Sequence, residues 1–194
     1  MNYQEKEEFF IFTDVETTGF CPIRNDVWQI CLIATDKSYN EISRYTAKMK
    51  PTSTKFISDK ALEISGMTFD NVMRFDNPKD KVIEITQWFN SLDRKTRWPS
   101  RLIFHAVNNF DWNHIDWLFK KQDMQYDLYK HVNWKNLEST LTIARGMKDH
   151  LNCNNYKLNT LCQLFDIPLN HHDAESDTQA LIPIHKELKR YEMA

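Results

Sequence analysis

The sequence lacks any apolar run that approaches the roughly 20 residues needed to cross a bilayer. Its first residues, Asn2 to Glu8, are polar and have neither the basic flank nor the apolar core of a secretory signal. From these two absences we expect no membrane partner, and the sequence predicts a cytoplasmic protein.

Cysteine is scarce, with four residues and no C-x-x-C pair. We therefore expect reduced thiols in the core or at the surface rather than a disulfide framework. Cys153 and Cys162 could be combined with His171 and His172 into a zinc site, but their spacing matches no usual pattern of zinc ligands.

An excess of charge of one sign is also absent. Lysine and arginine number 25 against 27 aspartates and glutamates, which gives a net charge of -2. Without a global basic field, any nucleic-acid partner has to be held locally. The chain has no repeats and no low-complexity linker, and its 194 residues can bury a core of their own. We expect residues 1–194 to form a single domain.

The most informative stretch begins at Phe9 and ends at Gly19. Its apolar start predicts a buried strand, yet Asp14 and Glu16 stand near its end. Residues two apart in a strand point to the same face, so the two carboxylates project side by side while Val15 packs on the other face. Such a pair is costly to bury unless a cation, usually a divalent one, neutralises it. A solvated strand end is the alternative.

Strands come first along the chain and then alternate with helices. Further strands are predicted at 26–35, 41–49 and 102–107, and helices near 61–64, 82–92, 112–120, 138–147, 157–165 and 174–191. This order favours an α/β fold, with a mixed sheet and helices packed on its faces.

Two more acids occupy unusual positions. Asp111 follows the fourth predicted strand and opens the next helix, where N-capping is the alternative to a functional role. Asp177 lies on the apolar stripe of the last helix, whose expected N-cap is Asp173, and a charge on that stripe needs a partner. His172, in the preceding loop, is placed to take a proton from a water beside a metal-binding acid, with simple solvation as the alternative.

Together these residues resemble the three exonuclease motifs of the DEDDh family. The motifs are Asp14-x-Glu16-Thr-Thr-Gly, Asn-Phe-Asp111 and His172-x-x-x-x-Asp177, in the order and approximate spacing that the family uses. The resemblance covers nearly the whole chain and is nearest to the proofreading subunit of bacterial DNA polymerase III and its stand-alone relatives. It implies a ribonuclease-H-like α/β fold, with a mixed five-stranded sheet and helices on both faces.

Three positions depart from the family pattern. Val107 and Asn108 stand near the place where relatives often carry a His-Asn pair, Gln29 where they usually have Glu, and Ser139 where they often have Asp. None of these is a metal ligand in the family pattern. The departures therefore concern substrate contacts more than the reaction.

The resemblance implies a metal-dependent 3′→5′ exonuclease that releases nucleoside 5′-monophosphates from single-stranded nucleic acid with a free 3′ end. Asp14, Glu16, Asp111 and Asp177 would hold two divalent ions, Mg2+ or Mn2+, about 4 Å apart, and His172 would be the general base. DNA is favoured over RNA, and a DNA polymerase is the protein partner suggested. A ribonuclease that trims short RNA and a non-catalytic polymerase or replication accessory module are the alternatives.

Six residues are expected to contact the substrate: Thr17, Thr18, Gly19, Phe20, Met67 and Phe110. The turn after Glu16 offers backbone N–H groups and close approach at a glycine. Phe20 is placed to stack on the last base or wedge beside it, unless it is a core residue. Four basic residues are further candidates for binding phosphate, or form a solvated surface: Arg94, Lys95, Arg97 and Arg101.

Overall fold

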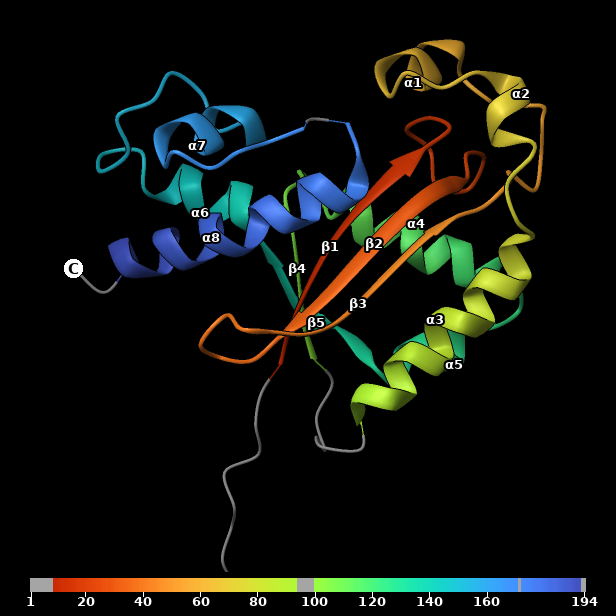
Figure 1. Cartoon of the computed structure of the whole chain (residues 1–194), viewed down its shortest axis with the longest axis horizontal. Helices are drawn as coiled ribbons and strands as arrows, with labels where there is room; N and C mark the ends of the chain where they lie inside the picture. Colours follow the sequence, from red (N-terminus) through yellow and green to blue (C-terminus); the bar gives the residue numbers. More distant parts are fainter. Residues whose placement is uncertain (1–8, 94–99, 171, 193–194) are drawn as a thin grey trace, which may run out of the picture.

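The apolar stretch near the start of the sequence forms β1 (Phe10–Thr17), the central strand of a five-stranded sheet. The computed structural model describes residues 9–93, 100–170 and 172–192. The other strands are β2 (Val27–Thr35), β3 (Glu41–Lys48), β4 (Ser100–Phe104) and β5 (Val132–Ser139). Their order is β3-β2-β1-β4-β5, antiparallel among the first three and parallel from β1 to β4 and from β4 to β5 (Figure 1). The predicted mixed sheet is confirmed.

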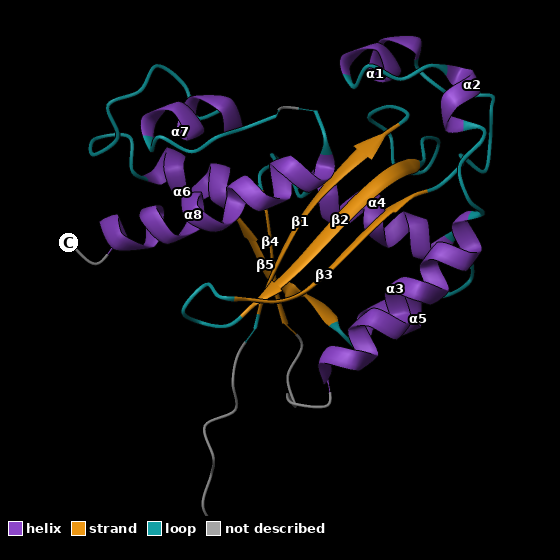
Figure 2. Cartoon of the chain, viewed as in Figure 1, coloured by secondary structure: helices purple, strands orange, loops and turns teal. Residues whose placement is uncertain are grey.

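Helices cover both faces of this sheet, as predicted (Figure 2). One face carries α3 (Pro78–Asp93), α4 (Phe110–Lys120) and α5 (Gln125–Tyr129), and the other carries α6 (Thr140–Gly146), α7 (Leu158–Leu164) and α8 (Ala174–Glu192). Each layer buries its own apolar core against the sheet. Two short helices, α1 (Asp59–Ile64) and α2 (Phe69–Val72), form a lobe beyond the carboxyl end of β1. None of the described helices is long and apolar enough to span a membrane.

Alternation along β1 decides which side chains meet which helices. Ile11 and Val15 belong to the core shared with α3 and α4, whereas Phe12 belongs to the core shared with α6, α7 and α8. Asp14 and Glu16 share the face of Phe12, because they lie two and four residues further along the strand. The two carboxylates therefore face the side of the sheet on which α8 packs.

A buried polar network fixes the middle of α8 to the sheet. His185 is 1% exposed, and its Nδ1 lies 2.9 Å from the hydroxyl of Tyr39 while its Nε2 lies 3.1 Å from Oε1 of Glu138. Lys189 and Arg101 pair with the same carboxylate at 2.6 and 2.7 Å. Burial alone would raise the pKa of Glu138, but the hydrogen bonds from these three residues lower it far more. Glu138 is thus an ionised carboxylate with three partners, and this network around His185 and Glu138 forms a clamp between α8 and the sheet.

The structure contains three elements that the sequence analysis did not place: β5, α2 and α5. The segment expected to begin a helix near Glu138 instead finishes β5, and α6 starts at Thr140 with Ser139 as its N-cap. The four cysteines are free thiols, as expected. Cys31 and Cys162 are buried, Cys153 is half-buried and Cys21 is exposed.

Candidate active site

Three of the predicted acids come together where β1 meets the start of α8. One ligand oxygen from each of Asp14, Glu16 and Asp177 lies within 4.8 Å of the other two. Asp177 is 4% exposed, on the buried stripe of α8. These carboxylates come from distant parts of the sequence. Alternation along β1 and the helical period of α8 bring them to one point.

Gln29 of β2, one of the residues that depart from the family pattern, fastens the start of α8 to the sheet through Asp173. The side chain of Asp173 accepts a hydrogen bond from the backbone N–H of Ser176 at 3.2 Å, so it caps the helix as expected. Gln29 Nε2 donates to Oδ1 of the same Asp173 at 2.8 Å. Because Asp177 follows one turn later, this contact fixes the height of its carboxylate above the sheet.

Asp111, from α4, does not belong to this group of three, but its charge acts on Asp14 and Glu16. The capping interpretation of this residue is wrong. The N-cap of α4 is Asn109, whose φ is 54° and whose side chain makes no capping hydrogen bond. Asp111 is 3% exposed, and its Oδ2 atom has no hydrogen-bond partner in the described structure. Burial raises its pKa to about 7, although hydrogen bonds from its own backbone N–H and from that of Val15 oppose the rise.

Burial and the neighbouring charges favour the protonated forms of Asp14 and Glu16. Burial, and then the charges of Asp111, Asp177 and Glu16, raise the pKa of Asp14 well above its ordinary value. Burial and the charge of Asp177 raise the pKa of Glu16 to about 7, opposed by a hydrogen bond from Ser65. Such a site lacks positive charge. Its all-oxygen donor set and the orphaned Oδ2 of Asp111 fit a hard divalent cation such as Mg2+ or Mn2+.

This electrostatic imbalance predicts a pH-dependent stability. The native protein holds protons on Glu16 and Asp111 up to a pKa of about 7, whereas the unfolded chain loses them near pH 4. Without divalent cations, we therefore expect the free energy of unfolding to fall as the pH rises from about 4 to about 7. Mg2+ at 100 times its dissociation constant should restore about 2.7 kcal/mol, or roughly 5–10 °C in Tm.

Thermal melts in EDTA, Mg2+ and Mn2+ at several pH values measure this effect. The stabilisation by metal should be largest above about pH 7, where the carboxylates would otherwise repel one another. A Tm in EDTA that rises with pH over this range, or an equal effect of metal at acid and neutral pH, would contradict the assignment of these carboxylates to one cation site.

Within the described part of the chain, two hollows border the acid cluster. The larger, of about 720 Å³, is lined by residues that include Asp14 and Asp177, and the smaller, of about 260 Å³, by residues that include Glu16. Phe20 and Phe110 line both, with ring centroids 6.4 Å apart in an edge-on arrangement. Phe20 is 86% exposed, so the core interpretation of this residue is wrong. An exposed aromatic ring between two hollows is suited to stacking on a planar ligand.

The turn between β1 and Phe20 is held rigidly. The hydroxyl of Thr17 donates to the carbonyl of Gly19 at 2.9 Å, and the buried hydroxyl of Thr18 accepts from the N–H of Asp26 at 2.9 Å. A Cβ atom at Gly19 would lie 2.6 Å from Nδ2 of Asn25, so only glycine fits there. Asn25 in turn donates to the carbonyl of Thr18. Sequence reasoning missed Asn25, because its contacts become visible only in the folded turn.

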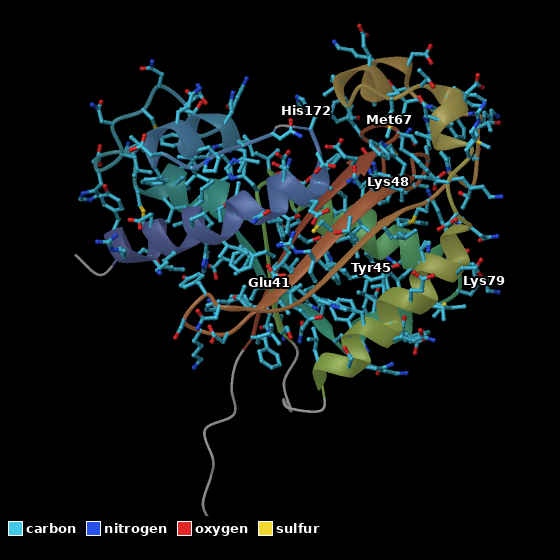
Figure 3. The ribbon with its side chains drawn as sticks, in the orientation of Figure 1. Glu41, Tyr45, Lys48, Met67, Lys79 and His172 are labelled. Carbon is cyan, nitrogen blue, oxygen red and sulfur yellow. The ribbon has the colours of Figure 1, made fainter. Side chains whose placement is uncertain are left out.

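Other predicted residues that the structure describes neither belong to this group of acids nor line the two hollows. Met67 lines a separate hollow beyond α1 with Leu62 and neither of the two beside the acids. His172, labelled in Figure 3, is exposed in the loop that leads to α8, with φ at 68°. The group of three carboxylates does not include it. Arg101 pairs with Glu138 and stands beside Phe10, at the opposite end of β1 from the acids, so its phosphate-binding interpretation is wrong. Three of the basic candidates lie outside the described residues: Arg94, Lys95 and Arg97.

Two solved structures of E. coli exonuclease I share this fold. Exonuclease I in complex with a dT13 oligonucleotide matches with a TM-score of 0.78 and 22% identity, over 94% of this chain and 41% of that one. The zinc-ion-bound form of its complex with single-stranded DNA matches with a TM-score of 0.79 and 21% identity, over 95% and 41%. The ribonuclease-H-like fold expected from the motifs is confirmed.

Similarity in sequence also extends over nearly the whole chain. The PolC-type DNA polymerase III of Bacillus subtilis (strain 168) is 27% identical over 177 residues, which are 90% of this chain and 11% of that protein. The chain thus spans about a tenth of the length of this relative. The sequence model of the exonuclease family (RNase_T) matches residues 11–184. The chain therefore belongs to the exonuclease family, and its resemblance to the DEDDh 3′→5′ exonucleases is confirmed.

Proposed function

We propose that the chain is a metal-dependent 3′→5′ exonuclease that removes nucleoside 5′-monophosphates from the 3′ end of single-stranded DNA. The observation that carries this proposal is the group of Asp14, Glu16 and Asp177 beside a hollow, with the buried Asp111 acting on it through its charge. Burial and neighbouring negative charges raise the pKa of Asp14 and Glu16, and burial raises the pKa of Asp111. Because such a cluster destabilises the protein unless cations occupy it, a binding function explains it better than a structural one.

Asp14, Glu16, Asp111 and Asp177 would hold the divalent cations, for which two Mg2+ or Mn2+ ions remain our proposal. Bound cations would supply Lewis acidity and the positive charge that offsets a phosphodiester group. The charges of Asp111, Asp177 and Glu16 all act on Asp14, which supports its role as the shared ligand. Gln29 and Asp173 would serve by keeping Asp177 in place.

The remaining residues would orient the substrate and move a proton. His172, exposed in the loop before α8, would accept the proton of the attacking water. Phe20 and Phe110 would hold the terminal base, with the smaller hollow as its pocket. The backbone of Thr17, Thr18 and Gly19 would approach the terminal nucleotide, since these residues line or support that pocket. Met67 would act at most at the margin of the site.

The relatives support DNA as the substrate. Exonuclease I was solved with single-stranded DNA, and the sequence relatives are DNA polymerases. We therefore propose a DNA polymerase as the protein partner. We also propose the cytoplasm as the compartment, with residues 1–194 acting as one exonuclease domain.

Trimming of short RNA is the second candidate function. RNA differs from DNA at the sugar by the ribose 2′-hydroxyl, which would change only local contacts in the pocket. A non-catalytic accessory module would have no use for the buried acids.

A time course on 5′-labelled oligonucleotides tests the proposal. Single-stranded DNA and RNA, with 3′ ends free or blocked, would be incubated with Mg2+, Mn2+ or EDTA. We expect a ladder that shrinks from free 3′ ends only, depends on metal and proceeds faster on DNA. A faster ladder on RNA would favour the trimming ribonuclease, and no ladder with either metal would favour the accessory module.

A further inference from the structure

The larger hollow beside the acid cluster contains cationic side chains as well as carboxylates. Asp14 and Asp177 line it, and so do Arg145 and Lys157. The cations come from the last turn of α6 and from the N-cap position of α7, which lie on the same side of the sheet as α8 (Figure 1). One hollow therefore joins the carboxylates proposed to hold metal ions to two cations of the protein itself.

Arg145 and Lys157 have no ion-pair partner within the part of the chain that the structure describes. Other cations in the molecule are paired closely, such as Lys121 with Asp26 at 2.7 Å and Arg44 with Glu175 at 2.6 Å. Arg145 and Lys157 share a hollow with two carboxylates and still form no ion pair with them. The hollow is thus lined by negative and positive groups that do not pair with one another.

Hydrogen bonds hold the backbone around Lys157 in place. The N–H of Lys157 donates to Oδ1 of Asn155 at 3.0 Å, and the hydroxyl of Thr160 donates to the same oxygen at 2.7 Å. His105, at the end of β4, contacts the carbonyl of Tyr156 through Nε2 at 2.9 Å. The loop that carries Lys157 is therefore tied to the sheet where Lys157 lines the hollow.

A ligand that matches this arrangement carries several negative charges in a row. A nucleic-acid strand has one phosphate per nucleotide, so a strand whose terminal phosphodiester lies at the acid cluster extends further phosphates into the larger hollow. The terminal base, in the smaller hollow, lies on the other side of the Phe20 and Phe110 rings. On the basis of the proposed function, we infer that Arg145 and Lys157 bind the phosphates of the nucleotides that precede the terminal one.

The inference predicts a dependence on strand length. We expect the variant Arg145→Ala/Lys157→Ala to lose affinity for a single-stranded oligothymidylate far more than for thymidine 5′-(p-nitrophenyl phosphate), which carries only the scissile phosphate. Each phosphate contact to a single strand adds a salt slope of about -0.7. Loss of two contacts should therefore lower the ratio of the two kcat/KM values roughly 10- to 30-fold at about 0.1 M salt, mainly through KM.

Salt titration and matched variants complete the experiment. The plot of log(kcat/KM) on the oligothymidylate against log salt should become shallower by about 1.4 in the double variant, and Arg145→Lys should retain most of the wild-type slope. The control Lys79→Ala/Lys130→Ala removes two exposed cations from α3 and the end of α5 and should change neither ratio nor slope. An equal loss on both substrates, an unchanged slope or an equal effect in the control would overturn the inference.

Binding measurements separate this inference from the proposed function. If the wild-type protein cleaves neither substrate, the exonuclease proposal fails, but fluorescence anisotropy of the labelled oligothymidylate in EDTA still reports on the two cations. Weaker binding by the double variant than by the control would then support the phosphate contacts. Equal binding by both variants would overturn them.

Discussion

Replacement of Asp14 by Asn should lower kcat by several orders of magnitude and, in EDTA, raise the Tm. Both results follow from the same contacts, since Asp14 lies among three other acids whose charges disfavour its ionised form. An amide removes the repulsion and therefore stabilises the metal-free protein, but it also removes the carboxylate that would bind cations. The activity is measured on the labelled oligonucleotide, and the Tm by thermal melts with and without Mg2+.

Asp177→Asn tests whether α8 contributes to the same site. Its activity should fall as far as that of Asp14→Asn, although the two residues belong to distant parts of the chain. The matched control is Asp80→Asn, which changes an exposed carboxylate in the first turn of α3 and should leave activity and metal response unchanged. Near-normal turnover in Asp177→Asn would remove α8 from the site and leave the β1 acids without their proposed partner.

His172→Ala should lower kcat by roughly 10²–10⁴, the usual contribution of a general base. Stabilisation by Mg2+ and the KM for the oligonucleotide should stay near their wild-type values, because His172 is exposed and lies outside the group of carboxylate ligands. Single-turnover rates and metal-dependent melts measure the two properties separately.

A histidine elsewhere in an exposed loop provides the comparison for this variant. His150→Ala, after α6, removes an exposed imidazole and should leave the rate unchanged. If His172→Ala instead abolished the stabilisation by Mg2+, His172 would be a metal ligand, and the base would have to be sought among other groups.

The paired acids could be found from sequence because they follow simple periods. Alternation in β1 places Asp14 and Glu16 on one face, and the helical stripe of α8 places Asp177 on its buried side. Both patterns are local and strong. The way in which β1 and α8 meet depends on tertiary packing, which periodicity does not predict. The resemblance to the DEDDh motifs indicated that the acids of the two elements belong to one site.

Other parts of the fold leave no such local pattern. β5 is an edge strand, and its pairing with β4 shifts by three residues between Ser100↔Val132 and Leu102↔Leu137, so alternation is lost around the exposed Trp134. α2 and α5 span four and five residues, which is too short for a helical period to appear. The sequence predicted no role for Arg145 and Lys157, because it does not distinguish a solvated surface cation from a cation that lines a hollow.

α8 is attached to the rest of the fold at two places, and these contacts affect how the acid cluster is lost when the protein unfolds. Gln29 holds Asp173 at the beginning of the helix, and the clamp around His185 and Glu138 holds it two turns beyond Asp177. The helix cannot open locally at Asp177 without breaking contacts with β2 or the buried clamp, and these belong to the core of the fold. The acid cluster should therefore share the cooperativity of global unfolding, so that partly opened molecules with a dismantled site are rare.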